Sequence, residues 1–286
     1  GIGGSYLGAY SFIKAFSNYF EKKDCEVLFA GYSLSSYYLN DLLNYLKDKD
    51  VVVNLISKSG GTLEPNLIFD RVLALLKEKY EDITDRVIIT TDKESALMTY
   101  AKENQFKTYE VPRNIGGRYS VFTTVGLLPM AVFGIDIKEI LRGIHDGKED
   151  VAFAYEYAIS RDLSYKQGKK VESFGVYEEK LLPFTEWLKQ LFAETQGKQE
   201  KGILPISTLN TRDLHSLGQF YQDGEKILFE TNIKIETTNT IDTFKYHLTL
   251  DEINAKAVDA VARAHKQGQV CSNIITLDKI SYYNLA

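Results

Sequence analysis

Cysteine is scarce in this chain of 286 residues, which contains only Cys25 and Cys271. Two cysteines cannot build the disulfide framework that small secreted proteins use to support a small core. Neither end of the sequence carries the charged and then apolar leader of a secreted protein. We therefore expect a cytoplasmic protein in a reducing compartment.

Long hydrophobic runs are missing as well. The longest apolar stretches, 121–125 and 126–134, are broken by threonine, glycine and proline. Both fall short of the roughly 20 residues that a membrane-spanning helix needs. We therefore expect a soluble protein with no membrane partner.

The chain has no excess of basic residues, with 34 Lys and Arg against 39 Asp and Glu and a net charge of −5. Because the basic residues are scattered among acids, nucleic acid is not an expected partner. The mean field of such a protein repels anions. An anionic ligand would need a local arrangement of backbone N–H groups and a few cations, and a phosphorylated metabolite fits that description.

Motifs for metal binding are also lacking. The sequence has no H-x-x-x-H pair, no C-x-x-C and no carboxylates clustered at ligand spacing, so we expect no protein-bound metal. Of the four histidines, His215 and His265 lie at or near predicted helices with polar neighbours and are the candidates for chemistry. His145 and His247 carry no such signal.

The composition is that of a globular protein, with 44% hydrophobic and 12% aromatic residues, enough for two domains of ordinary size. Segments rich in β-branched or aromatic residues alternate with amphipathic stretches, which is typical of an α/β fold with mostly parallel sheets. In the first half, strands are predicted over 26–30, 51–57 and 86–91, and helices over 36–47, 67–79 and 93–104.

A helical region separates this half from a second one. Residues 123–168 are predicted to be almost wholly helical, with breaks between helices at Pro129 and Gly143. The second half starts near Lys170, with strands predicted over 171–177, 226–231 and 273–277, and helices over 183–194, 214–222 and 249–267. We therefore expect a first domain over 1–125, a helical connection over 126–168 and a second domain over 169–286.

Four glycines surround Ser5 near the start of the chain, at positions 1, 3, 4 and 8. They predict a turn leading into a helix that continues through 14–20, where backbone N–H groups at the positive end of the helix can approach a phosphate. The spacing does not fit the dinucleotide pattern G-x-G-x-x-G, because Tyr6 takes the sixth position. A structural turn with no ligand remains the alternative.

The segment SKSGGTLEP, residues 57–65, lies between a predicted strand and a predicted helix. It offers the hydroxyls of Ser57, Ser59 and Thr62, two glycines and the charge of Lys58, a combination that suits a phosphate group. A plain helix cap needs a single serine or threonine, so the composition of this loop favours anion binding.

Two further segments hold residues with catalytic potential. In GGRYS, residues 116–120, two glycines precede Arg118 and allow its guanidinium to reach over a ligand, although an isolated arginine is more often a surface residue. In QLFAETQGK, residues 190–198, Glu194 lies near the end of an apolar helix. Partial burial there would raise its pKa toward the range useful to a general base. An exposed glutamate without a role is the alternative.

Taken in order, seven segments resemble the bacterial branch of the glucose-6-phosphate isomerase family: GIGGSYLG, SKSGGTLEP, GGRYSVFT, QLFAETQGK, KGILP, DLHSLGQ and AHKQG. The resemblance covers nearly the whole chain, and the order and spacing of the motifs make it specific. It implies two sugar-isomerase (SIS) domains, each a three-layer α/β/α sandwich around a mostly parallel sheet. It also implies a homodimer with shared active sites, a hexose phosphate as the small-molecule substrate, and no cofactor.

The same resemblance implies a role for each matching residue. The residues that would hold the substrate phosphate are Ser5, Ser57, Lys58, Ser59 and Thr62, with Gly3 and Gly4 shaping the turn. Arg118 would stabilise the negative charge of an enediolate, and Gln190 would contact the sugar. Glu194 would be the base that moves a proton between carbon-2 and carbon-1, and His215 of the partner subunit would assist ring opening.

The sequence departs from the family pattern at a few positions. Gly61 stands where a threonine is usual, and Gln269 replaces a glycine. Thr195 and Gln196 follow the glutamate where serine and an acid are commoner. The family's further active-site lysine, in a Q-P-G-V-E-x-x-K motif, has no counterpart here, and no strand precedes the glycine turn. We therefore expect a fragment that lacks both termini.

Two other interpretations stay open at this stage. A different hexose-phosphate isomerase with the same domain type would keep a phosphate loop but need not keep the segments of Arg118 and Glu194 together. A SIS regulator that senses sugar phosphates without catalysis would usually carry a DNA-binding helix-turn-helix, and it would not need Glu194, Arg118 or His215.

Overall fold

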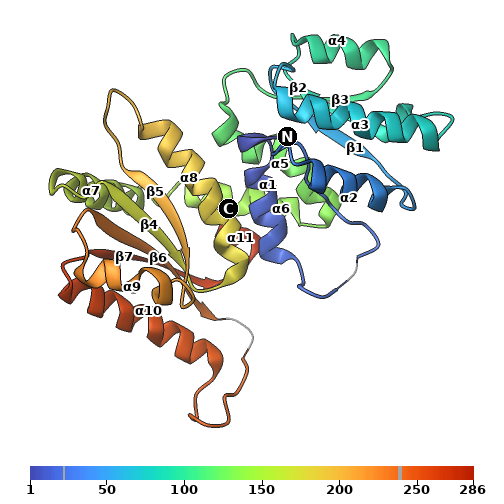
Figure 1. Cartoon of the computed structure of the whole chain (residues 1–286). Coiled ribbons are helices and arrows are strands. Elements are labelled where there is room, and N and C mark those ends of the chain that lie inside the picture. Colours follow the sequence, from blue (N-terminus) through green and yellow to red (C-terminus); the bar gives the residue numbers. More distant parts are fainter. Residues whose placement is uncertain (22, 238–239) are drawn as a thin grey trace. The chain divides into compact units, whose positions relative to one another are not determined.

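The computed structural model describes residues 1–21, 23–237 and 240–286. The chain divides into two compact units, one formed by 1–13 and 19–135 and the other by 14–18 and 136–286. Each unit is built on one parallel β-sheet flanked by helices (Figure 1). This architecture confirms the predicted α/β class.

The sheet of the first unit has the order β1-β2-β3 and is parallel throughout. Its strands are β1 (Val53–Ile56), β2 (Val87–Thr91) and β3 (Lys107–Glu110). Its main core joins apolar side chains of β1 and β2 to α2 (Ser36–Leu46), α3 (Leu63–Lys79) and α4 (Ala96–Glu103). The side chains of Leu76, Val87 and Ile89 are fully buried there, and each such burial contributes roughly 1.5–3 kcal/mol.

Serine side chains set where two of these helices begin. Ser35 accepts a hydrogen bond from the Tyr38 amide at 3.3 Å at the start of α2, and Ser95 accepts one from the Met98 amide at 3.1 Å at the start of α4. Each satisfies an amide that has no partner within its own helix. Helix α3 starts four residues before the predicted position, since Pro65 is tolerated in a first turn.

Three features of the first half of the chain differ from the predictions. The segment 26–30 forms no strand in this described part of the chain. The Phe29 carbonyl accepts a hydrogen bond from the Tyr38 hydroxyl (2.5 Å), and the Ala30 carbonyl accepts one from the Gly1 nitrogen (3.0 Å). Helix α1 (Leu7–Phe16) ends four residues early, at a Ser-Asn pair that competes with helical hydrogen bonding. Strand β3 was missed because its sequence, KTYE, is mostly polar.

The helical prediction for 123–168 is confirmed, but its breaks lie elsewhere. The helices are α5 (Thr124–Phe133), α6 (Ile137–Gly147) and α7 (Val151–Lys166). Pro129 lies inside α5, which ends at Gly134 with a φ of 99°. Gly143 lies inside α6, where a Cβ would come 2.3 Å from the Tyr283 carbonyl oxygen. This glycine is a close-packing position and not a helix end.

The sheet of the second unit has the order β5-β4-β6-β7 and is also parallel. Its strands are β4 (Val171–Val176), β5 (Leu204–Leu209), β6 (Leu228–Thr237) and β7 (Ser272–Lys279). Helices α7 and α8 (Leu182–Gln196) cover one face, and α9 (Leu214–Asp223) and α10 (Leu250–Gln267) cover the other (Figure 1). Strand β5 was missed because it contains Pro205, which fits its place at the sheet edge.

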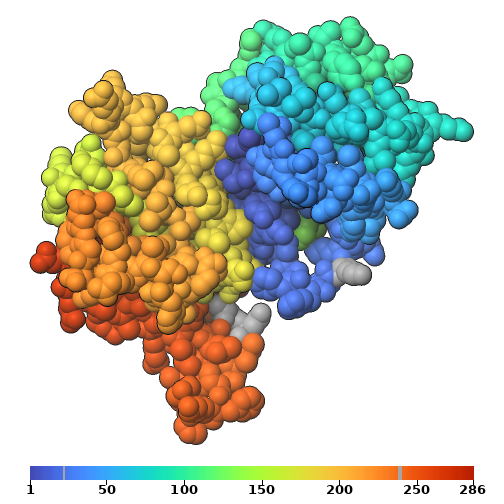
Figure 2. All heavy atoms as spheres, in the orientation of Figure 1, coloured from blue at the N-terminus to red at the C-terminus, as the bar shows by residue number. Residues whose placement is uncertain are grey.

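Short elements complete the described chain. They are the 3₁₀ helices η1 (Gly3–Ser5), η2 (Thr84–Arg86), η3 (Gly117–Phe122) and η4 (Glu179–Leu181), and the terminal helix α11 (Tyr282–Leu285). The segment 240–249 stands out from the second unit (Figure 2), and its Phe244 side chain is 93% exposed. Within the described ranges, no helix is both long enough and apolar enough to cross a membrane.

Candidate active site

The motif residues of the first unit gather at the carboxyl edge of its sheet. Ser57 directly follows β1, Asp92 follows β2 and Val111 follows β3. Because the three strands are parallel, the loops after them meet at one edge. Open parallel sheets bind ligands outside the carboxyl ends of their strands, so this edge is the expected place for a ligand.

The hydroxyl loop, residues 57–62, leads from β1 into α3. Its own hydroxyls order it, since the Gly60 amide donates to Ser57 Oγ and the Gly61 amide donates to Ser59 Oγ, both at 3.2 Å. Gly60 has a φ of +74°, which favours glycine, and the Asn66 amide group holds its carbonyl at 2.7 Å. The loop therefore presents hydroxyls beside the amino-terminal end of α3, where an anion is favoured.

The glycine turn packs directly on the arginine loop, residues 113–118. Gly4 is buried, and a Cβ on it would lie 2.1 Å from the Gly117 carbonyl oxygen. The Ser120 hydroxyl binds both segments, with Oγ 2.7 Å from the Gly117 carbonyl and 3.4 Å from the Gly4 carbonyl. Gly4 is thus required for the contact between the two loops.

The glycine turn also approaches the hydroxyl loop, because a Cβ on Gly1 would lie 3.3 Å from the Ile56 carbonyl at the end of β1. Ser5 is half-buried at the end of η1, just before α1. The first unit therefore brings together Gly3, Gly4, Ser5, the hydroxyl loop and Arg118. The half-buried Arg118 side chain lies over the Tyr119 ring, with Cζ 4.6 Å from the ring centroid.

Lys58 makes a contact that the sequence did not predict. Its ammonium donates to the carbonyls of Arg113 at 2.7 Å and Ile115 at 2.8 Å. An ammonium has three N–H donors, so two of them bind the arginine loop. No sequence motif linked Lys58 to 113–115, because the contact joins residues more than fifty positions apart.

The other predicted site residues lie in the second unit. Gln190 and Glu194 are one helical turn apart on α8, and Gln190 Nε2 lies 3.4 Å from Glu194 Oε2. Glu194 is exposed, so of the two alternatives that the sequence left open for this side chain, partial burial is not the one observed. Positions 192 and 194 differ by about 200° around a helix, so the packing of Phe192 against Phe174 turns Glu194 away from the apolar side.

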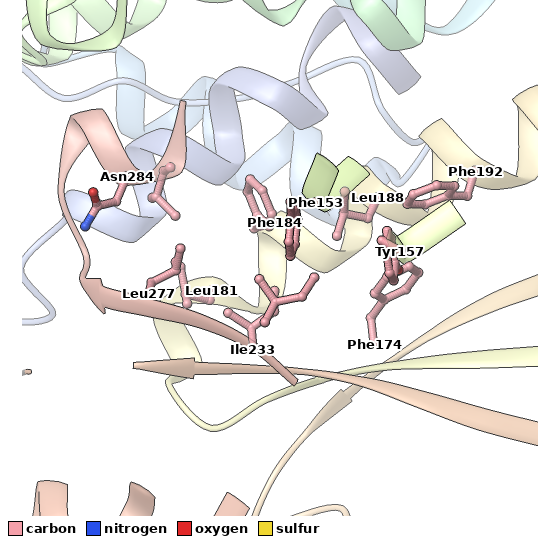
Figure 3. Close-up of a pocket in the computed structure, with 12 residues that line it drawn as sticks. Phe153, Tyr157, Phe174, Leu181, Phe184, Leu188, Phe192, Ile233, Leu277 and Asn284 are labelled. Atoms are coloured by element: carbon pink, nitrogen blue, oxygen red, sulfur yellow. The ribbon is translucent and has the colours of Figure 1, made fainter. Parts of the chain in front are cut away.

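Figure 3 shows what the apolar side of α8 contacts. Phe184, Leu188 and Phe192 point from the helix into a cavity of about 300 Å³, with Phe174 and Ile233 of the sheet opposite them. This lining suits apolar packing and offers little to a phosphate. The packing of these apolar side chains against the sheet therefore sets which side of α8 faces the core.

The two candidate histidines have different surroundings. His215 is exposed in the first turn of α9. His265 is buried in α10, where Nδ1 lies 2.9 Å from Glu230 Oε2, and the Ser272 hydroxyl donates to the same oxygen at 2.7 Å. His265 is therefore part of a core polar cluster, whereas the His215 side chain lies at the surface.

Comparison with known proteins decides the family. Residues 1–202 match the family described as phosphoglucose isomerase. Over 314 aligned residues the chain is 41% identical to a protein named glucose-6-phosphate isomerase from Heliobacterium modesticaldum, covering 100% of this chain and 70% of that protein. The chain belongs to the phosphoglucose isomerase family.

Solved structures agree with this fold. A hypothetical protein from Thermus thermophilus superposes with a TM-score of 0.89 at 25% identity, over 100% of this chain and 73% of that one. A glucose-6-phosphate isomerase from Chlamydia trachomatis superposes with a TM-score of 0.73 at 19% identity, over 99% of this chain and 60% of that one. The SIS-type architecture predicted from the phosphoglucose isomerase motifs is thereby confirmed.

Proposed function

We propose that this protein interconverts glucose 6-phosphate and fructose 6-phosphate, the aldose-ketose isomerisation used in glycolysis and gluconeogenesis. The observation that carries the proposal is the meeting of the glycine turn, the hydroxyl loop and the arginine loop at one sheet edge. A phosphate bound there places its sugar beside Arg118, which belongs to the same edge. We also propose that the chain forms a first SIS domain over 1–125, a helical connection over 126–168 and a second SIS domain over 169–286.

The phosphate is held by hydroxyls, backbone amides and the ammonium of Lys58. Ser57, Ser59 and Thr62 come from the hydroxyl loop and Ser5 from the glycine turn. Thr62 precedes α3 but gives it no side-chain cap among the described residues, which is consistent with a hydroxyl used for a ligand. The net charge of −5 gives no general attraction for an anion, so affinity depends on these local donors.

The chemistry is a proton transfer through an enediol. After ring opening, Glu194 takes the proton from carbon-2 of the aldose while the electron pair moves to the carbonyl oxygen. Arg118 stabilises the enediolate charge as it forms, because a cation fixed beside the developing negative charge lowers the energy of the transition state. The proton of the carbon-2 hydroxyl passes to the carbon-1 oxygen, Glu194 returns its proton to carbon-1 and the carbon-2 carbonyl forms, so the ketose results without gain or loss of atoms.

The remaining residues orient the sugar and open the ring. Gln190 lies one turn from Glu194 on the same helix and contacts the sugar. His215, supplied by the partner subunit of a homodimer, assists ring opening, which agrees with its exposed position on α9. The enzyme acts in the cytoplasm, on a hexose phosphate and without nucleic acid.

The experiment that tests the proposal is turnover of fructose 6-phosphate by the full-length protein, coupled to detection of glucose 6-phosphate. We expect inorganic phosphate to inhibit competitively, and Ser57→Ala and Ser59→Ala to weaken that inhibition. Ser33→Ala, an exposed serine outside the hydroxyl loop, should leave it unchanged. Phosphate binding without turnover would contradict the enzyme and favour a sugar-phosphate sensor.

A further inference from the structure

Three residues at the carboxyl edge of the first sheet form a closed ring of contacts. The Lys58 ammonium donates to the Arg113 carbonyl at 2.7 Å, Arg113 Nε donates to Asp92 Oδ2 at 3.0 Å, and the Asp92 amide donates to the Lys58 carbonyl at 3.2 Å. Each residue comes from the loop after a different strand, β1, β2 or β3. The ring therefore joins all three loops of this edge.

Further bonds fix two members of the ring. Arg113 Nη1 donates to Glu94 Oε2 at 2.5 Å, and the Glu94 amide donates to Asp92 Oδ1 at 2.8 Å. Asp92 is buried while Arg113 is exposed. The Asp92 carboxylate therefore has a fixed position, and the exposed guanidinium of Arg113 binds to it. The backbone of Arg113 is thereby anchored to the loop after β2.

The ring acts on the segment that leads to Arg118. The Lys58 ammonium also donates to the Ile115 carbonyl at 2.8 Å, and Gly116 and Gly117 follow directly. Glycines restrict the backbone least, so the position of Arg118 depends on anchors at both ends of this short stretch. The contact of Gly117 with Gly4 provides one anchor, and the ring provides the other.

We propose that Asp92 and Arg113 are positioning residues for Arg118, and that Lys58 acts on the arginine loop as well as on the phosphate. The inference rests on the proposed isomerase function. Stabilisation of an enediolate requires the guanidinium in one place, and a displacement of about 1 Å can cost a hundredfold in rate. Arg113 itself contacts the carboxylates of Asp92 and Glu94.

Phosphate binding should be largely independent of Arg113. The hydroxyl loop has its own supports, because the Thr91 hydroxyl donates to the Ser57 carbonyl at 2.7 Å and Asn66 holds the Gly60 carbonyl. A lost ring contact therefore changes the placement of Arg118 more than the placement of the phosphate. This difference separates a positioning role from a binding role.

The test compares Arg113→Met with Arg113→Lys in the full-length protein. We expect Arg113→Met to lower kcat about tenfold or more, while the inhibition constant of inorganic phosphate changes less than about twofold. Arg113→Lys should recover part of kcat, since its ammonium can pair with Asp92. Arg86→Met is the matched control, because Arg86 pairs with Asp50 near the start of β2, at the other end of the strand; its kcat should not change.

Hydrogen exchange supplies a readout that does not depend on turnover. We expect Arg113→Met and Asp92→Asn to speed exchange of the amides at 114–118, with no change across the hydroxyl loop. Unaltered kcat and exchange in Arg113→Met would overturn the inference, as would a loss of phosphate affinity equal to the loss of kcat. If the wild type shows no turnover, the proposed function fails, and exchange at 114–118 still decides whether the ring orders the arginine loop.

Discussion

Arg161 and Glu172 form an ion pair in the core of the second unit, with Nε 2.7 Å from Oε2 and side chains only 5% and 0% exposed. The Tyr157 and Thr231 hydroxyls donate to the other carboxylate oxygen at 2.6 and 2.7 Å. Arg161 Nη1 also donates to the Gln196 side chain at 2.9 Å. The pair thus connects the core to the last residue of α8, two positions after Glu194.

Removing one partner of this pair should be strongly destabilising. Arg161→Met leaves Glu172 buried and uncompensated, and such losses cost about 3–5 kcal/mol. Denaturant unfolding should show a lower midpoint with an unchanged slope. The double variant Arg161→Met with Glu172→Leu should recover most of the loss, because well-packed apolar replacements of buried pairs are often neutral. A single variant as stable as the wild type would contradict this account.

Gly60 and Gly61 should respond differently to substitution. Gly60 has a φ of +74°, and a Cβ there would lie 2.8 Å from the Leu97 Cβ, so Gly60→Ala should cost at least about 1–2 kcal/mol. Among the residues that the structure describes, a Cβ on Gly61 meets only Ser59 Oγ, at 3.9 Å, so Gly61→Ala should change stability by less than about 0.5 kcal/mol. Thermal unfolding of the two alanine variants checks this prediction.

Gly61→Thr should tighten phosphate binding. Position 61 has room for a side chain, and a threonine there adds a hydroxyl beside those of Ser59 and Thr62. We expect a lower inhibition constant for inorganic phosphate than in Gly61→Ala, which controls for the loss of glycine. Equal constants in the two variants would show that the added hydroxyl does not reach the phosphate.

Asp213 should make the start of α9 sensitive to acid. Its pKa is lowered, chiefly by the hydrogen bond from Arg212 and also by the Leu209 amide, which donates to Oδ2 at 2.8 Å. Since the pKa in the folded protein lies below the unfolded value, this stabilisation is complete above the unfolded pKa of about 3.9. It is lost as the pH falls through the folded value.

The variant Asp213→Asn measures this effect. At pH 7 it should lower the free energy of unfolding by about 1–2 kcal/mol, as expected for a charge-assisted hydrogen bond. The difference from the wild type should shrink as the pH falls below about 4. Asp223→Asn, at the other end of α9, is the control for the loss of a carboxylate and should not lower the free energy of unfolding at pH 7. A difference that stays constant down to pH 2 would contradict the assignment.

The sequence predicted elements where local pattern and packing agree. The strand at Val53–Ile56 and helix α10, with its capping box of Thr249 and Glu252, were both predicted. The prediction of secondary structure failed where hydrogen-bond partners from distant parts of the chain decide the conformation. Residues 26–30 have the composition of a strand, but the Phe29 carbonyl accepts a hydrogen bond from the Tyr38 hydroxyl and the Ala30 carbonyl accepts one from the Gly1 nitrogen. Strand β3, with few apolar residues, forms because β2 pairs with it.

The candidate site shows the same limit. The hydroxyls, glycines and Arg118 could be selected from the sequence, since they cluster in short segments next to predicted strands and helices and match the motifs of the family. The exposure of Glu194 could not, because it depends on which side of α8 packs on Phe174. Nor could the bonds from Lys58 to 113–115, which arise from the order of three parallel strands.

The most direct test of the isomerase account is the turnover of Glu194→Gln, beside the wild type and Glu186→Gln, with fructose 6-phosphate in buffer containing a chelator. Glu186 lies on the same helix and pairs with Lys189, so its variant controls for loss of a surface charge. The account predicts that Glu194→Gln loses about 10²–10⁴ of kcat, while Glu186→Gln and phosphate affinity stay near wild type. A Glu194→Gln enzyme with kcat within a few-fold of wild type would contradict it.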